Sequence, residues 1–492
     1  MKPWFVLPGA LAILICGMAF SAVAAPTFNK DVAPIVFEKC VTCHRPGEVA
    51  PFSLMQYQDV KRRARLIAEV TEKRFMPPWQ ASPGHGDFRG ARRLSEEQIA
   101  TLREWAKAGA PEGDPKDLPA TPKFAEGWAL GEPDLVVKMT EPYTLAAEGK
   151  DVFRVFVIPL NVEEDKYVRA VEFRPGNRRI VHHALFFLDN AGRARELDAA
   201  DPGPGYGRMG GPGFTPSGGL GGWAPGFTAK ALPDGVGRPV RKGADLVVQM
   251  HFHPSGKPEV EQASVGLYFA KKPPQKILVP FPWAARRAID IPPGEKKYEV
   301  RTSFTVDPRI APTGVTLAGL TPHAHLLCKE VKVDATLPGG ETRPLIWIKD
   351  YDWDWQDEYF YREPMQLPVG TKIDMYYRYD NSPQNPKNPS NPPRRVRWGE
   401  QTTDEMAIVF FHVLVERDAG GLAGMLLRSR LGNRGAEEGA RQGQGQGADT
   451  ADSLVERALL RRFDKNGNGM LEPEERQAAR EALSREFGGG ER

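Results

Sequence analysis

The chain has 492 residues, of which 41% are apolar and 26% are charged, so it can form about three globular domains and is not wholly disordered. Its 66 lysines and arginines nearly balance its 63 aspartates and glutamates, which gives no electrostatic reason to expect a nucleic-acid partner. The 50 glycines and 45 prolines together make up 95 of the 492 residues, about 19%, against a usual share of roughly 12%. This excess favours turn-rich β domains over a helical bundle.

The N-terminus carries the pattern of a cleaved secretory signal. Lys2 precedes an apolar run over 4–20, and small residues follow up to Ala24. Pro8 interrupts the run, which is shorter than the roughly 20 residues that span a bilayer. We therefore expect residues 1–24 to be removed, no transmembrane segment, and a periplasmic or secreted mature protein.

Residues 27–112 combine helical signals with the attachment signature of a c-type haem. Cys40 and Cys43 stand three positions apart, as bonding to two vinyl groups requires, and His44 follows as an axial ligand of the iron. A bare Cys-x-x-Cys would also suit a redox disulfide or half of a zinc site. The adjacent histidine, the export signal and the lack of a second cysteine pair favour one covalently bound haem c.

The sixth haem ligand is expected to be a methionine, because thioether ligation raises the potential into an electron-transfer range. Met76 is the preferred candidate, since the prolines after it stiffen the loop over 74–79. Met55 and His85 are the alternatives. The layout of residues 27–112 resembles class I cytochrome c, whose methionine loop the Met-Pro-Pro-Trp sequence is similar to.

One helix in this region is well marked. Ser95 and Gln98 form a capping box, and Gly109 supplies the stop. Residues 113–133 are typical of a linker, and β-type runs separated by Gly, Pro and Asn clusters follow it. We expect strands at 152–160, 167–173, 180–188, 246–253, 264–269, 298–306, 315–320, 331–337, 372–379 and 406–415.

The whole chain is therefore expected to be multidomain. An N-terminal α-helical cytochrome c precedes a central pair of all-β, jelly-roll-like sandwich domains over 134–290 and 291–416. A flexible linker over 417–452 leads to a C-terminal helix–loop–helix over 453–488.

Five histidines lie in or beside the predicted strands. His323 and His325 alternate, so on a strand both rings would face the same side and could chelate one ion. His182 and His183 are adjacent and begin on opposite faces, so sharing a metal requires a twist of the strand. His251 lies in a third run, and two adjacent or alternating pairs are a stronger signal than any lone histidine.

Taken in order with a methionine after Asp-Glu, this set resembles the copper type II, ascorbate-dependent monooxygenases, the family of dopamine β-monooxygenase and the peptidylglycine α-hydroxylating enzyme. The resemblance covers about residues 130–416, and its four-part order is far more specific than any one piece. Its ligand sets assign one copper that stores an electron and one that binds dioxygen. The resemblance implies that His182, His183 and His251 hold the first copper, and that His323, His325 and Met406 hold the second.

Several positions depart from that family. Thr321 stands where the amidating members place an arginine that grips the peptide carboxylate, and Ile408 and Phe410 replace their Asn and Tyr substrate contacts. These changes argue against a peptidylglycine substrate. His253 is expected to be a partner of a ligand or a spare ligand. Cys328 alone remains outside the haem motif and the signal, so the cysteines that staple the animal enzymes are missing.

Residues 464–475 match the twelve-residue EF-hand loop, and helical patterns flank it. Gly469 stands at position 6, where the sharp turn needs it. With two asparagines among the ligands, affinity is expected to be weak and the role structural. The predicted ligands of one calcium ion are Asp464, Asn466, Asn468, the backbone of Met470, Glu472 and Glu475.

Together these motifs predict an exported oxidoreductase with two copper ions, one haem c and one calcium ion. We expect hydroxylation of an aliphatic C–H of a small-molecule substrate by O2. Electrons come from an external donor, either an ascorbate-like reductant or a redox protein. The alternatives are a copper and haem electron-transfer protein without hydroxylase activity and a calcium-dependent surface-binding protein.

Overall fold

The computed structural model describes residues 25–417, apart from 47, 49, 125–126, 225–226, 228, 309–310 and 400. The predicted signal and EF-hand loop lie outside the described residues. The described chain divides into two compact units: unit 1 holds the residues up to Pro77 together with Arg93–Pro122, and unit 2 holds Pro78–Arg92 together with the residues from Lys123 on. No helix in the described part combines the length and apolar character needed to cross a membrane.

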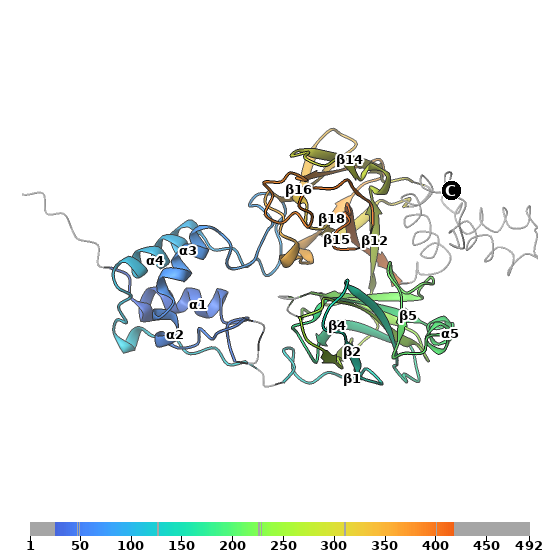
Figure 1. Ribbon diagram of the computed structural model, residues 1–492, viewed down its shortest axis with the longest axis horizontal. Coiled ribbons are helices and arrows are strands. Elements are labelled where there is room, and N and C mark those ends of the chain that lie inside the picture. Colours follow the sequence, from blue (N-terminus) through green and yellow to red (C-terminus); the bar gives the residue numbers. More distant parts are fainter. Residues whose placement is uncertain are drawn as a thin grey trace, which may run out of the picture. The chain divides into compact units, whose positions relative to one another are not determined.

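Unit 1 is a small helical body (Figure 1). The capping box predicted before its last long helix is present, with Ser95 Oγ accepting from the Gln98 backbone N–H at 3.2 Å and Gln98 Oε1 accepting from the Ser95 N–H at 2.9 Å. Trp105 on that helix is fully buried, with its ring centroid 6.1 Å from that of Phe28. The helices are η1 (Phe28–Val32), α1 (Ala33–Lys39), α2 (Tyr57–Lys61), α3 (Ala64–Glu72), α4 (Glu96–Lys107) and η2 (Pro115–Asp117).

Unit 2 consists mainly of β-sandwich sheets, which confirms the expected all-β character of the central region. Its described residues include one long mixed sheet in the order β1 (Leu135–Lys138), β11 (Ser264–Phe269), β4 (Lys166–Arg174), β8 (Val236–Val240), β12 (Lys276–Ala284), β21 (Ile408–Glu416), β15 (Val315–His323) and β18 (Tyr359–Leu367).

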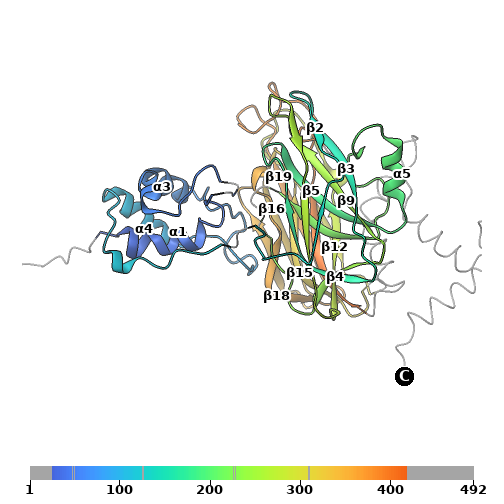
Figure 2. The same ribbon diagram turned by 90° about the horizontal axis from the view of Figure 1, so that it is seen from below.

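Two smaller sheets pack on opposite ends of this long sheet (Figures 1 and 2). The first has the order β6 (Tyr206–Gly207), β3 (Val152–Pro159), β9 (Asp245–Phe252), β5 (Val181–Asp189) and β7 (Gly218–Trp223), and Figure 2 shows β5, β9 and β3 side by side. The second has the order β14 (Tyr298–Thr305), β19 (Lys372–Tyr379), β16 (Cys328–Thr336) and β17 (Thr342–Ile348).

The remaining elements of unit 2 are short. Strands β2 (Tyr143–Leu145) and β10 (Glu259–Glu261) pair, as do β13 (Asp290–Ile291) and β20 (Val396–Arg397). The helical segments are α5 (Arg193–Ala200), η3 (Arg286–Ala288) and η4 (Trp353–Trp355). All ten predicted strands have a counterpart, whereas β12, β17, β18 and several shorter strands were not predicted.

Each end of the long sheet forms its own apolar core. One core lies between β4 and β11 and the first small sheet, and contains Phe173 and Val248. The other lies between β15, β18 and β21 and the second small sheet, and contains Leu320 and Val333. The parallel pairing of β8 with β12 joins the two halves. Strand β12 precedes the predicted domain boundary at 290 yet pairs with β21, so the two halves share one sheet.

The segment Pro78–Arg92, here called the inserted segment, leaves the helical unit and packs within the β unit. It forms isolated antiparallel bridges with both β17 and β18. Its backbone bonds include Ser82 N–H to Trp347 O at 2.7 Å and Arg89 N–H to Phe360 O at 2.8 Å. The sequence did not predict this arrangement, because the segment lies within the region expected to be cytochrome c.

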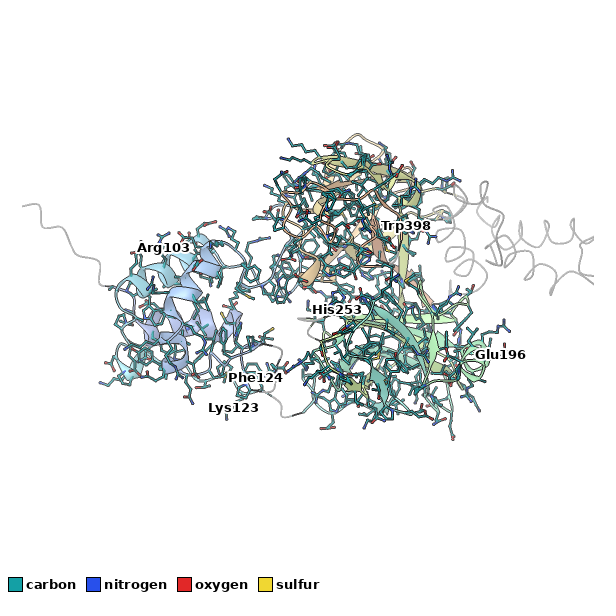
Figure 3. All side chains as sticks on the ribbon, viewed as in Figure 1. Arg103, Lys123, Phe124, Glu196, His253 and Trp398 are labelled. Carbon is teal, nitrogen blue, oxygen red and sulfur yellow. The ribbon has the colours of Figure 1, made fainter. Side chains whose placement is uncertain are left out.

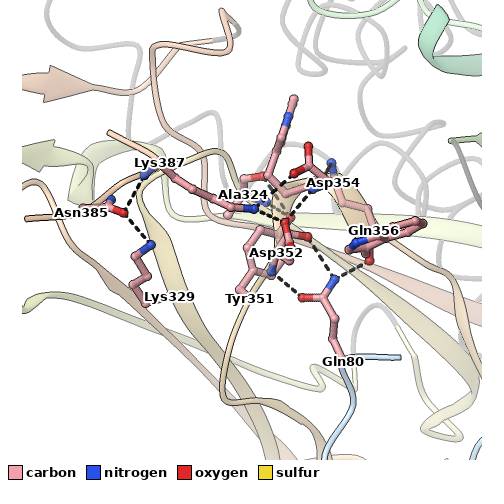
Figure 4. A network of polar contacts seen from close by, with 11 residues as sticks. Gln80, Ala324, Lys329, Tyr351, Asp352, Asp354, Gln356, Asn385 and Lys387 are labelled. Atoms are coloured by element: carbon pink, nitrogen blue, oxygen red, sulfur yellow. Dashed lines mark hydrogen bonds and ion pairs between the residues drawn. The ribbon is translucent and has the colours of Figure 1, made fainter. Parts of the chain in front are cut away.

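Apolar contacts and a glutamine amide hold the inserted segment. Phe88 is 3% exposed and stacks on Tyr361 with ring centroids 5.1 Å apart, and burying such a ring stabilises by about 1.5–3 kcal/mol. The Gln80 amide donates to the backbone oxygens of Asp352, at 3.0 Å, and Trp355, and its Oε1 accepts from the Asp352 N–H at 2.6 Å (Figure 4). The inserted segment therefore fixes the turn that contains η4.

Replacing Gln80 by alanine should lower the free energy of unfolding of unit 2 by about 1–3 kcal/mol, because it leaves backbone groups of the turn without partners. Denaturant unfolding followed by tryptophan fluorescence measures the change. The control is Gln366→Ala, an exposed glutamine that donates to Thr316 Oγ1 at 2.7 Å, which should stay within about 0.5 kcal/mol. Equal changes in the free energy of unfolding in the two variants would contradict a structural role for the Gln80 side chain.

Candidate metal centres

Three histidines from two neighbouring strands converge in unit 2. His182 and His183 lie on β5 and His251 lies on β9, and one ring nitrogen from each falls within 4.8 Å of the others. The Nδ1 atoms of His182 and His183 are 3.2 Å apart, and those of His183 and His251 are 3.4 Å apart. The structure thus brings the predicted first ligand set together with the same ring nitrogen, Nδ1, turned inward from each residue.

A β-bulge places the adjacent pair on one side of the sheet. Val181 pairs with Phe252 and His183 pairs with the preceding His251, so β5 advances two residues where β9 advances one. The extra residue, His182, is the bulged one, and bulges re-aim side chains in this way. This irregularity supplies the twist that a shared metal requires of two neighbouring histidines.

Burial keeps the rings of His182 and His183 neutral. It lowers the pKa of His182 to about 3 and that of His183 well below its ordinary value, with the neighbouring histidines adding to both shifts. A metal-binding imidazole must be neutral, because the lone pair that binds the ion is otherwise occupied by a proton. His182 and His183 are therefore in the protonation state that metal binding needs at neutral pH.

Asp151 supports the cluster from the outer side. Its Oδ2 lies 3.1 Å from Nε2 of His251, and its Oδ1 lies 2.7 Å from Nδ1 of His253. Burial alone would raise the pKa of Asp151, but contacts with His251, Thr402 and His253 outweigh burial and hold it well below its ordinary value. A carboxylate behind a histidine fixes the ring orientation and increases its basicity toward a metal.

The two histidines of the second set lie at the end of β15, beside the segment before β21. His323 is the last residue of β15, whereas His325 lies beyond the strand, so the prediction that strand alternation aligns the two rings is wrong for His325. The turn after the strand brings the rings together instead, with centroids 5.3 Å apart.

Carbonyl acceptors fix the tautomers of this second pair. Nδ1 of His323 is 2.6 Å from Oε1 of Gln356, and Nδ1 of His325 is 3.1 Å from the backbone oxygen of Asp404. Because a carbonyl oxygen only accepts, each Nδ1 carries the proton and each Nε2 keeps its lone pair. Burial lowers the pKa of His325 to about 3, which leaves it neutral. The second set therefore presents Nε2, the opposite nitrogen from the first.

The buried carboxylate of Glu405 ties the ligand segments together. It accepts backbone N–H groups from His325 at 2.9 Å, Leu327 at 2.6 Å and Met406 at 3.1 Å. Burial raises the pKa of Glu405 to about 8, although these three donors act in the opposite direction. These hydrogen bonds tie the backbones of His325 and Met406 to the same carboxyl group. Met406 itself is buried, with 8% of its surface exposed.

Two buried tyrosines complete this support. The Tyr351 hydroxyl accepts from the Ala324 N–H and donates to the Ala324 carbonyl, both at 3.0 Å, so it clasps the residue between the two histidines. The Tyr379 hydroxyl donates to the Met406 carbonyl at 2.7 Å. Sequence reasoning missed these residues, since their partners are non-local; for Glu405 the available signal was its position directly before Met406.

One tryptophan contacts both histidine sets. The ring of Trp353 is stacked on His182, with centroids 4.5 Å apart and an interplanar angle of 13°. Its centroid lies 5.1 Å from that of His325, edge to face, and 6.3 Å from that of His323. Trp353 is 6% exposed. The two sets are therefore neighbours, and one buried indole contacts both of them.

The other histidines of unit 2 have structural surroundings. His253, labelled in Figure 3, is exposed, and its Nδ1 lies 2.7 Å from Asp151, which also contacts His251. His412 is buried, with Nε2 2.9 Å from Thr321 Oγ1. The ring of His85, in the inserted segment, lies 4.8 Å from that of Trp347. Cys328, the one cysteine outside the haem motif and the signal, is buried, with 1% of its surface exposed.

The haem motif follows α1 in unit 1. Cys40 ends that helix, and the His44 N–H donates to its carbonyl at 2.9 Å. His44 Nδ1 lies 3.1 Å from the Phe52 carbonyl, so Nδ1 carries the proton and Nε2 keeps the lone pair that an iron ligand needs. Cys43 stands one residue before His44. Two thiols and an imidazole with a free Nε2 fit a covalently bound haem.

The sixth haem ligand stays a prediction. Met55 and Met76 are both partly buried in unit 1. The Phe75 and Met76 N–H groups both donate to the Val70 carbonyl, at 2.9 and 3.1 Å, so the backbone before the prolines is fixed to the end of α3. The six predicted calcium ligands between Asp464 and Glu475 lie outside the described residues.

Comparisons with known proteins leave the family of the chain open. No family model and no curated protein matches it. Similar solved structures include the major capsid protein P2 from Bacteriophage PM2, at 9% identity over 57% of this chain and 97% of that chain, with a TM-score of 0.25. Another is Broad Bean Stain Virus, at 8% identity over 62% and 95%, with a TM-score of 0.28. Alignments this weak identify neither a family nor a function.

Replacing His251 by alanine should remove about one of two bound coppers and leave the haem spectrum unchanged, because its Nδ1 belongs to the first set alone. Metal analysis of the purified holoprotein, together with the haem absorption spectrum, measures both. The matched control is His253→Ala, which also loses a contact with Asp151 but should keep both coppers. Two coppers in the His251 variant would show that this residue is not a ligand.

Replacing Met76 by alanine should lower the haem potential by on the order of 0.1 V or more, since axial ligands tune haem potentials over about 0.8 V. A redox titration of the haem band measures the change. Met55→Ala is the control and should leave the potential near that of the unaltered protein. If the Met55 variant shifts instead, Met55 is the ligand; if neither shifts, the role passes to His85.

Proposed function

We propose that this protein is an exported, periplasmic or secreted copper- and haem-dependent monooxygenase that hydroxylates an aliphatic C–H of a small-molecule substrate with O2. The observation that carries the proposal is the pair of neighbouring histidine sets, one presenting Nδ1 atoms and the other presenting Nε2 atoms. The donor types fit copper, because imidazole suits both of its oxidation states and the thioether of Met406 suits Cu(I).

The reaction balances with one substrate C–H, one O2, two electrons and two protons, which give one alcohol and one water. When bound, two coppers would store one electron each and provide the place where O2 reacts. The residues around the two sites would orient the histidine rings. Asp151 fixes the ring of His251, and Gln356 holds His323 in the tautomer that leaves Nε2 free. Buried surroundings strengthen these contacts, because little water competes for them.

The haem unit is proposed to deliver the electrons. With His44 and a methionine as axial ligands, both positions on the iron are filled, so electron delivery rather than oxygen chemistry is its natural task. An external donor, either an ascorbate-like reductant or a redox protein, would reduce the haem. The predicted EF-hand would bind calcium in a structural role.

A second candidate function is a copper and haem electron-transfer protein without hydroxylase activity. The burial of the rings favours it: His251 is 2% exposed, His325 is 3% exposed, and the buried Trp353 contacts both sets. The two functions differ in their use of oxygen. Substrate-independent oxygen consumption with peroxide release, and no hydroxylated product, supports the second function.

Replacing Met406 by isoleucine should keep most of the second copper and reduce hydroxylation by about a hundredfold or more, since even partners of metal ligands are worth 10–100-fold. His323 and His325 still hold the ion, but the soft ligand that favours Cu(I) is lost. The measurement is transfer of one ¹⁸O atom from ¹⁸O2 into product, screened over a panel of aliphatic compounds. Full activity in a copper-loaded Met406→Ile protein would contradict the mechanism.

Haem-reduced, copper-oxidised protein should reoxidise its haem without oxygen, because the proposed route runs from the haem to the copper of the first set. Anaerobic stopped-flow absorbance at several protein concentrations measures this step. The rate should be independent of concentration and should be lost in His251→Ala but kept in His253→Ala. A haem that stays reduced until oxygen or a second protein arrives would show that the fused modules act independently.

A further inference from the structure

Trp353 occupies a position that the coordination of two metals does not itself require. It lies in η4, between β17 and β18 in the sequence, and its indole is stacked on His182 and makes a T-shaped contact with His325. Each of these two histidines belongs to a different set. The ring planes of Trp353 and His182 are only 13° apart, so the two π systems are stacked nearly in parallel.

The turn that contains Trp353 is fixed from several directions. The side chain of Asp352 accepts from the Asp354 N–H at 3.1 Å, and the Gln80 amide binds the backbone at both ends of the turn (Figure 4). Gln356 donates to the Trp353 carbonyl at 3.3 Å and also accepts from His323 at 2.6 Å. The turn therefore holds the indole and one ligand of the second set in a single network.

We propose that Trp353 is the electron-transfer bridge between the two histidine sets, an inference that rests on the proposed copper function. With a copper ion held by each set, Trp353 would carry one electron from the cuprous ion of the first set, which would become cupric, to the cupric ion of the second set, which would become cuprous. No bond forms or breaks, and the indole keeps its proton and ends unchanged. Gln80 is a positioning residue for this bridge.

A second aromatic residue, Phe153, provides a control that distinguishes an electron-transfer bridge from an aromatic ring that only packs on a histidine. Phe153 stacks on His251 with ring centroids 4.2 Å apart and an interplanar angle of 8°, and its other ring contact is with His183. Phe153 is thus as closely stacked on a ligand as Trp353 is, but both of its partners belong to the first set. Removing Phe153 changes the packing around one metal without changing the path between the two.

The test compares electron exchange in Trp353→Leu, Trp353→Phe and Phe153→Leu with the unaltered holoprotein. Pulse radiolysis adds one electron to the fully oxidised protein, and rapid-freeze EPR follows its distribution between the two cupric signals. Trp353→Leu should slow the exchange by about tenfold or more, which corresponds to about 1.4 kcal/mol or more in the barrier. Trp353→Phe should be intermediate, and Phe153→Leu should match the unaltered protein. An unchanged rate in Trp353→Leu with both coppers retained overturns the inference.

A fluorescence measurement gives a second readout that does not depend on turnover. The emission of Trp353 is obtained by subtracting the fluorescence of Trp353→Phe from that of the protein with Trp353 present. Cu(II) should quench it both in His323→Ala, where the first set is complete, and in His182→Ala, where the second set is complete. Quenching from one set alone contradicts a position between the two metals.

The outcomes separate this inference from the proposed function. If the protein binds two coppers and transfers ¹⁸O but the rate of electron exchange does not depend on Trp353, the monooxygenase proposal is supported and the bridge is rejected. Exchange that depends on Trp353, without ¹⁸O transfer, keeps the bridge and supports the electron-transfer protein. Uptake of fewer than two coppers by the unaltered protein contradicts both.

Discussion

The candidate centres depend on one immobilised turn, residues 352–356. Gln80 of the inserted segment binds its backbone, Trp353 covers His182, and Gln356 orients His323. These contacts come from parts of the chain that are far apart in sequence, so the turn is where their positions become mutually dependent. A metal site needs its ligands held within a few tenths of an ångström, and a network in which each group is satisfied supplies that rigidity.

The two histidine sets are held in position by different structural features. In the first, a β-bulge turns the adjacent pair inward, and Asp151 stands behind His251. In the second, His323 ends β15, and the buried Glu405 side chain accepts the backbone N–H groups of His325 and Met406, which lie outside the strands. One set thus presents Nδ1 and the other Nε2, because different groups hold the rings in the two sets.

The sequence predicts local features well and non-local ones poorly. The capping box at Ser95 and the ten strands follow from patterns within a few residues, and the structure has each of them. The strand twist demanded by His182 and His183 was also foreseeable, because alternation places neighbours on opposite faces. The inserted segment, the position of His325 beyond β15 and the placement of Trp353 were not, since each depends on pairing with distant segments.

The central claim is that two copper ions bind on either side of Trp353. Anomalous diffraction from crystals of the copper-loaded protein, recorded on both sides of the copper absorption edge, locates them directly. The account predicts two separate copper peaks, one among the Nδ1 atoms of His182, His183 and His251 and one beside Nε2 of His323 and His325. A single peak shared by all five histidines, or no peak at either set, would contradict it.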